Sequence, residues 1–260
     1  MKFLKYILSG FSKVMSVDAE FLSDSTGTIP RRILCLVFKD IKTGEIFRYW
    51  VDKQEHVPHF FDYERTLFIS FSATAEHGVF QQLHHGKPKY MWDCFVENKC
   101  LYLPFLAKNK IGLIDTCGRY NIDTISKEQK NWEIDRILRR KEFKDLPFEY
   151  SLEEQQKILD YCQSDVEENA QLFIAQCQDI ENKNKLETEA DFKRALYEIT
   201  FRGYSQANFA QIERNGFTVD TGLVNTFNTY WPLVKETIIE RYNKKLDVYE
   251  GLVLKKSKFD

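Results

Sequence analysis

The sequence lacks several features that would assign it to a broad class of protein. No stretch approaches the ~20 consecutive apolar residues that a membrane-spanning helix needs. The six cysteines include no Cys-x-x-Cys pair, which disfavours a zinc ribbon and a dense disulfide framework, so we expect a reducing, cytoplasmic setting. The net charge is only −2, so nothing indicates a protein that grips nucleic acid over its whole surface. A local basic patch remains compatible with this charge balance.

The composition is that of an ordinary globular protein, with 43% hydrophobic and 29% charged residues. A chain of 260 residues can hold one large domain, alone or with a smaller annex. At the N-terminus, Lys5 and Lys13 interrupt an apolar run, and no cleavage site of small residues follows. We therefore interpret this segment as a lead-in to the first strand.

The first part of the chain predicts a sheet. Three β-like runs, residues 13–21, 32–39 and 45–51, are separated by turn sequences and indicate an antiparallel meander. A fourth run, residues 66–72, is apolar enough to be buried on both faces, as the central strands of α/β folds are. It leads into a predicted helix over residues 73–83.

The middle of the chain is more helical. Residues 89–95 predict a fifth strand, which enters a helical stretch over residues 103–110. A charged region, residues 121–145, fits either a solvated helix face or a basic patch beside a substrate. Its clustered basic residues are Arg136, Arg139, Arg140, Lys141 and Lys144. A long helix is predicted from Ser151 onward, with Ser151 and Glu154 forming a capping box.

The last third of the chain predicts a hinge followed by two helices. The polar residues 179–190 suggest a hinge. Residues 191–215 and 223–244 have amphipathic helical spacing and are joined by the segment 216–220. We expect these helices to form a C-terminal helical annex.

Two acids stand inside the first predicted strand. Asp18 and Glu20 are two residues apart, so both side chains project from the same face. Carboxylates on a core strand are costly unless they are compensated, and a divalent metal compensates them well. A strand end with both acids in water explains this short pattern equally well.

Three further residues extend the pattern. Glu76 follows the buried fourth run in the first turn of the next helix, where the helix dipole alone would also favour an acid. Tyr161 and Asp165 are four residues apart on the long helix and share one face, as an ordinary surface pair also would. Taken together with Asp18 and Glu20, these side chains would supply oxygen ligands for two Mg²⁺ or Mn²⁺ ions. The tyrosine would orient or deprotonate an attacking water.

The order of these motifs carries a resemblance to a known family. With VDAEF, SATAEHGVF and DYCQSDV in sequence, the chain resembles the DEDDy branch of the DnaQ-like 3′→5′ exonucleases. Tyr161 indicates this branch, because the histidine branch would place His where Asp160 stands. The chain resembles most closely the N-terminal proofreading region of phage- or prophage-type family A DNA polymerases. The run RALYEITFRGYSQANFAQIERNGFTVDTGLV is similar to the helical segment that enters their polymerase domain.

The resemblance implies roles for the five residues. Asp18 would bridge two metal ions, Glu20 would bind the ion on the nucleophile side, and Asp165 would complete the shell of that ion. Glu76 would act mainly through water on the second ion, and Tyr161 would orient the nucleophile. Most family members have Asp at the position of Glu76, so the longer side chain is a departure from the pattern.

The resemblance also implies a fold and an activity. We expect an α/β fold with an RNase H-like mixed sheet flanked by helices, an exonuclease domain over residues 1–180, and a truncated polymerase-like helical segment over residues 186–260. The expected substrate is a single-stranded or frayed DNA 3′ end. We expect no polymerase activity from this chain alone, because it holds no polymerase palm. It would be a truncated gene product, an exonuclease with a remnant annex, or one piece of a split polymerase. The alternatives are an RNase D-like exoribonuclease and a non-catalytic interaction module that binds a separate polymerase polypeptide.

Overall fold

The computed structural model describes residues 1–23, 30–52, 62–102, 111–126, 128, 130, 149–216 and 218–246. The predicted helical stretch at 103–110 lies outside these residues. So does the basic cluster of Arg136, Arg139, Arg140, Lys141 and Lys144. The chain divides into two compact units, Met1–Asn215 and Gly216–Asp260.

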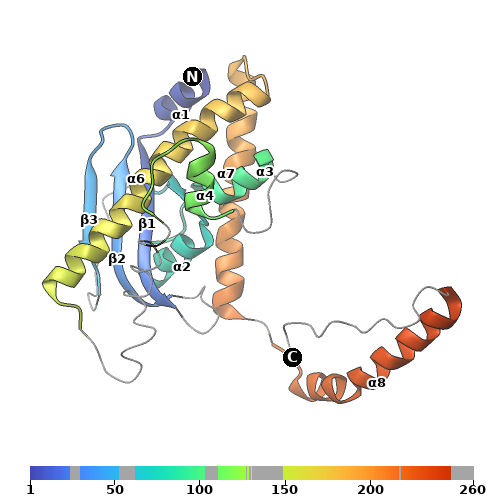
Figure 1. Ribbon diagram of the computed structural model, residues 1–260. Coiled ribbons are helices and arrows are strands. Elements are labelled where there is room, and N and C mark those ends of the chain that lie inside the picture. The colour runs from blue at the N-terminus through green and yellow to red at the C-terminus, as the bar shows by residue number, and fades with distance from the viewer. Residues whose placement is uncertain are drawn as a thin grey trace. The chain divides into compact units, whose positions relative to one another are not determined.

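A five-stranded mixed sheet forms the centre of the first unit (Figure 1). Its strands are β1 (Lys13–Ser23), β2 (Pro30–Asp40), β3 (Ile46–Trp50), β4 (Thr66–Ser70) and β5 (Tyr90–Asp93), in the order β3-β2-β1-β4-β5. The pairs β1–β2 and β2–β3 are antiparallel, which confirms the predicted meander. The pairs β1–β4 and β4–β5 are parallel. The first unit is therefore an α/β structure with a mixed sheet.

Strand β4 is buried at every residue, as its apolar run predicted. Because side chains alternate along a strand, Leu67 and Ile69 enter a core cluster on one face of the sheet with Phe173. Phe68 enters a cluster on the other face with Phe80. The sheet thus has an apolar core on each side, and helices cover both faces.

The segment that leads into the first strand is a helix, which was not predicted from the sequence. Helix α1 spans Lys2–Gly10 and buries Phe3 and Ile7, which are four residues apart. Its lysines lie on the exposed side, as in any amphipathic helix. The backbone N–H groups of Lys2 and Phe3 donate to the Glu181 carboxylate at 3.1 and 3.0 Å. A distant acid therefore stabilises the helix start, and sequence reading alone does not find such a partner.

The long helix α6 (Leu152–Lys183) crosses the sheet and packs against β1, β2 and β3 (Figure 1). It begins with the predicted capping box, in which Ser151 and Glu154 bond each other's backbone N–H groups. The helix continues through Lys183, so the predicted hinge at 179–190 is wrong for its first five residues. Ile180 is buried there, and the Asp179 carboxylate accepts bonds from two tyrosine hydroxyls, so this polar stretch is a packed helix end.

The shorter helices are α2 (Thr74–Gln82), α3 (Cys94–Tyr102) and α4 (Leu113–Arg119). The fifth predicted strand and the helix after β4 are confirmed by β5 and α2. Among the described residues, no helix is long and apolar enough to cross a membrane. All six cysteines are free.

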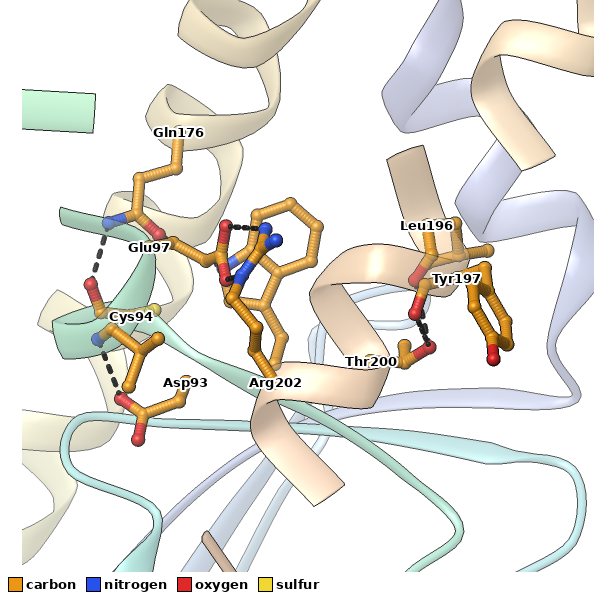
Figure 2. A network of polar contacts seen from close by, with 10 residues as sticks. Asp93, Cys94, Glu97, Gln176, Leu196, Tyr197, Thr200 and Arg202 are labelled. Atoms are coloured by element: carbon orange, nitrogen blue, oxygen red, sulfur yellow. Dashed lines mark hydrogen bonds and ion pairs between the residues drawn. The ribbon is translucent and has the colours of Figure 1, made fainter. Parts of the chain in front are cut away.

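Helix α7 (Glu189–Asn215) belongs to the first unit, packing against β5 and α2. Figure 2 shows the ion pair that ties it to α3, where Arg202 donates two bonds of 2.8 and 2.6 Å to the buried Glu97 carboxylate. Gly203 lies so close to β5 that a Cβ would stand 2.0 Å from the Met91 carbonyl oxygen. The first predicted annex helix is thus part of the sheet domain, while a nuclease boundary near residue 180 stays a prediction.

The second unit is described by one long helix. Helix α8 spans Thr221–Leu246 and confirms the second predicted annex helix. Asp220 caps its start, because the Asp220 carboxylate accepts a bond of 3.0 Å from the Leu223 N–H.

Candidate functional site

Asp18 and Glu20 lie on β1 beneath the long helix α6. Both are partly exposed, although the four residues before Asp18 are buried. Their carboxylate oxygens and the Cys162 Sγ on α6 all lie within 4.8 Å of one another. The Cys162 thiol donates to Asp18 Oδ2 at 3.4 Å. The predicted pair is therefore beside the core, under a helix that restricts its access to water.

Helix α6 brings Tyr161 and Asp165 to the same place. Both are buried, with exposures of 7% and 6%. Two residues before Asp18, the buried Ser16 hydroxyl donates to the Val166 carbonyl oxygen at 2.8 Å. This bond fixes the position of α6 on β1, so Asp165 lies close enough to Asp18 for the two charges to repel.

Glu76 comes from a third element. It is in the first turn of α2, and the Asp93 carboxylate holds the start of that helix by accepting the N–H groups of Ser72 and Ala73 at 3.1 and 2.9 Å. The Glu76 side chain is 3% exposed, and its Oε2 is buried without a hydrogen-bond partner in the described part of the chain. A buried carboxylate oxygen in that state is costly unless a cation binds it.

The acids repel one another. Burial, and to a smaller extent repulsion from Asp165, raises the pKa of Asp18 from 3.8 to about 7. Burial and the charge of Asp18 raise the pKa of Glu20 well above its usual range, and the same two causes act on Glu76. Another acid of the cluster contributes to the raised pKa of each of Asp18, Glu20 and Glu76. The negative charge of the cluster is therefore only partly compensated by its surroundings.

Lys130 supplies positive charge that the sequence did not reveal. Its Nζ lies 2.8 and 3.2 Å from the two Asp165 carboxylate oxygens and 5.5 Å from the centre of the Tyr161 ring. Burial alone would lower the pKa of Lys130, but attraction to the nearby acids, Asp165 first among them, outweighs burial and raises it. A lysine 35 residues before its partner, within a charged stretch, gives no local sequence signal.

Two more side chains of α6 were also missed. Glu168 is one turn after Asp165, and burial together with repulsion from Asp165 raises its pKa to about 7. Its i+3 spacing from Asp165 was a readable signal for a shared face. From the sequence, Cys162 had no expected role in the site. Burial raises the pKa of its thiol well above the usual range, so it is a hydrogen-bond donor to Asp18.

The donor set fits a hard divalent cation. Oxygen ligands from Asp18, Glu20, Asp165 and Glu76 suit Mg²⁺ or Mn²⁺. The unpartnered Glu76 oxygen is a ready ligand, whereas the protonated thiol of Cys162 is a poor one. Asp18, Glu20 and Cys162 form the group of described residues whose ligand atoms lie within 4.8 Å of one another. Glu76 and Asp165 are not in this group, so their oxygens lie further from the other ligand atoms.

The structure thus places Asp18, Glu20, Tyr161 and Asp165 where α6 packs on β1, and Glu76 on α2 lies near enough to Asp18 for their charges to repel. No model of a known protein family matches the chain, and no curated protein matches its sequence. Any functional interpretation therefore rests on the geometry of the acids and on the chemistry that it permits.

Proposed function

We propose that the first unit is a metal-dependent 3′→5′ exonuclease that hydrolyses phosphodiester bonds at DNA 3′ ends. One observation carries the proposal: three separate elements bring four carboxylates together with too little positive charge, and the pKa of Asp18 rises to about 7. Clusters of acids with strongly raised pKa values are typical of functional sites. The motif order supplies the reaction class.

The position of each residue suggests its role in the reaction. Asp18, Glu20, Asp165 and Glu76 would hold two divalent cations. Bound ions would supply electrostatic stabilisation of the attacking and leaving oxygens of a phosphodiester displacement. Tyr161, one turn before Asp165 on α6, would orient the attacking water. Burial raises the pKa of Tyr161, so its hydroxyl keeps its proton and acts as a hydrogen-bond donor.

The position of the acids within the fold also supports this proposal. An RNase H-like arrangement would place acids on a central strand beneath a crossing helix, and β1 and α6 have this relation. The helix α7 completes the same unit, since it holds α2 through a bond of 3.1 Å between Thr74 and Gln206. The polymerase-like role of the C-terminal segment remains part of the resemblance.

The test is release of mononucleotides from a DNA strand labelled at its 3′ end. With Mg²⁺ or Mn²⁺ we expect release by the wild type and none by Asp18→Ala, because electrostatic stabilisation supplies most of the rate in such sites. Asp123→Ala, at an exposed aspartate, is the matched control. Equal metal-dependent release by wild type and Asp18→Ala would refute the proposal. A matched RNA strand in the same assay separates a deoxyribonuclease from an RNase D-like enzyme.

Glu76 has a separate test because it departs from the family pattern. Glu76→Asp should keep partial activity and Glu76→Ala should lose nearly all of it, since only the first retains a carboxylate. Equal activity of these two variants would remove Glu76 from the site.

A further inference from the structure

Lys130 is paired with Asp165, one of the proposed metal ligands. Its Nζ contacts both carboxylate oxygens, at 2.8 and 3.2 Å, so a single ammonium group spans the two ligand atoms. The Asp165 side chain is 9% exposed and that of Lys130 is 20% exposed. An ion pair this shielded is weakly screened by salt. Lys130 is therefore a strong counter-charge inside the acid cluster.

The same ammonium group acts on more than one acid. Besides Asp165, which it contacts, the Lys130 ammonium is attracted by the nearby negative charges of Asp18 and Glu168. Lys130 thus compensates part of the charge that a divalent cation would otherwise neutralise.

A cation at Asp165 and the ammonium of Lys130 cannot both take the present contacts without cost. A carboxylate can accept several bonds, but two positive groups on the same two oxygens would lie only a few ångströms apart and repel strongly in a shielded site. Metal entry must therefore shift Lys130 or weaken its ion pair. Ile125, five residues before Lys130, donates its backbone N–H to Glu168 Oε1 at 3.4 Å. This bond can remain when the Lys130 side chain moves.

We propose that Lys130 is a resident counter-ion that competes with the divalent cation for Asp165. This inference rests on the proposed metal site, and it assigns to Lys130 a role in metal affinity that the acid motifs do not contain. In the metal-free protein Lys130 stabilises the acid cluster. When a cation binds, Lys130 gives up its contacts with Asp165, and the apparent metal affinity is lower than the acids alone would give.

The test is Mn²⁺ binding by the full chain, measured as the free Mn²⁺ signal in electron paramagnetic resonance titrations. The variants are Lys130→Met and Lys130→Gln, which remove the charge with different side-chain chemistry. Lys157→Met is the matched control, since Lys157 is on α6 and pairs with Glu153 on the surface. We expect both Lys130 variants to bind Mn²⁺ about ten-fold more tightly than wild type, because a like charge beside a divalent ion is removed. The control should match wild type.

A second measurement reads the metal-free state. In EDTA the Lys130 variants should unfold at a lower temperature than wild type, because Asp165 loses its counter-charge. Mn²⁺ should then raise their unfolding temperature by more than it raises that of wild type. A variant that folds only with Mn²⁺ would give the same answer in a stronger form.

The outcomes separate this inference from the proposed function. Mn²⁺ affinity that is unchanged within about two-fold, or weaker, in both Lys130 variants overturns the competition while leaving the metal site standing. Absence of Mn²⁺ binding in wild type, control and variants alike refutes the metal site, and with it the exonuclease proposal.

Discussion

Neutralising Asp18 should stabilise the protein when no metal is present. The substitution is Asp18→Asn, which keeps the size of the side chain and an oxygen that can accept the bond from the Cys162 thiol. In the wild type, burial and the charge of Asp165 raise the pKa of Asp18 from 3.8 to about 7. The ionised carboxylate is therefore less favourable in the folded chain than in the unfolded chain, and the amide removes that cost.

The size of the effect follows from the pKa. Each pKa unit corresponds to ~1.4 kcal/mol, so the whole change would be worth roughly 4 kcal/mol. Asp18 is partly exposed and shares its repulsion with Asp165, so we expect about 1–2 kcal/mol in the free energy of unfolding. For a unit of this size that is an increase of about 3–6 °C in unfolding temperature.

The size of this stability advantage depends on pH. Well below pH 3.8 the Asp18 side chain is protonated in both states and contributes no difference. As pH rises from 3.8 toward 7, the unfolded chain ionises this group first, the folded chain holds more protons, and wild-type stability falls. The advantage of Asp18→Asn should therefore be full at pH 8 and less than half as large at pH 5.

The assay is thermal unfolding by circular dichroism at both pH values, in EDTA and in Mn²⁺. At pH 8 in EDTA the variant should be the more stable protein. Mn²⁺ should stabilise the wild type and leave the variant nearly unchanged, because the variant has lost a ligand. Asp123→Asn, at an exposed position, should behave as wild type throughout. If Asp18→Asn is no more stable than wild type at pH 8 in EDTA, the charge argument for this site is refuted.

Three other predictions concern packing and rate. Gly203→Ala should cost about 3 kcal/mol in urea unfolding, because an added Cβ meets a β5 carbonyl oxygen at 2.0 Å, while Gly118→Ala, with open space around it, should cost little. Arg202→Met should cost ~3–5 kcal/mol by leaving buried Glu97 unpaired, and the double variant with Glu97→Leu should recover much of that loss; a double variant as unstable as the single one would contradict this. Tyr161→Phe should slow nucleotide release about ten- to hundred-fold with unchanged Mn²⁺ affinity, and an unchanged rate would remove the hydroxyl from the reaction.

Local patterns predicted the strands and the long helix because their causes are local. The β-like runs and turn sequences around β1 and β2, the apolar run of β4, and the capping box at Ser151 each depend on residues close together in sequence. Helix α1 was missed although Phe3 and Ile7 have helical spacing, because Lys5 between them was interpreted as an interruption of an apolar run. Lys5 lies on the exposed side of the helix.

Long-range pairs could not be predicted in the same way. Lys130 and Asp165 are 35 residues apart and Arg202 and Glu97 are 105 residues apart, and each is a common surface type on its own. Motif order can select the acids of a site, since their roles repeat in a family. It does not give the counter-charges, because a lysine can approach an acid from any segment that the fold brings near.

The cost of the acids bears on the choice between an enzyme and a non-catalytic module. Glu76 is buried with one oxygen unpartnered in the described part of the chain, and burial raises the pKa of Glu20 well above its usual range. Neutral side chains of similar size would stabilise both positions in a protein that served only as a scaffold. Three acids, Asp18, Glu20 and Glu76, have raised pKa values, so their ionisation lowers the stability of the metal-free fold. A bound cation that recovers this loss explains them, and packing alone does not. The cost of these acids therefore supports the proposed metal site, on which the proposed enzyme depends.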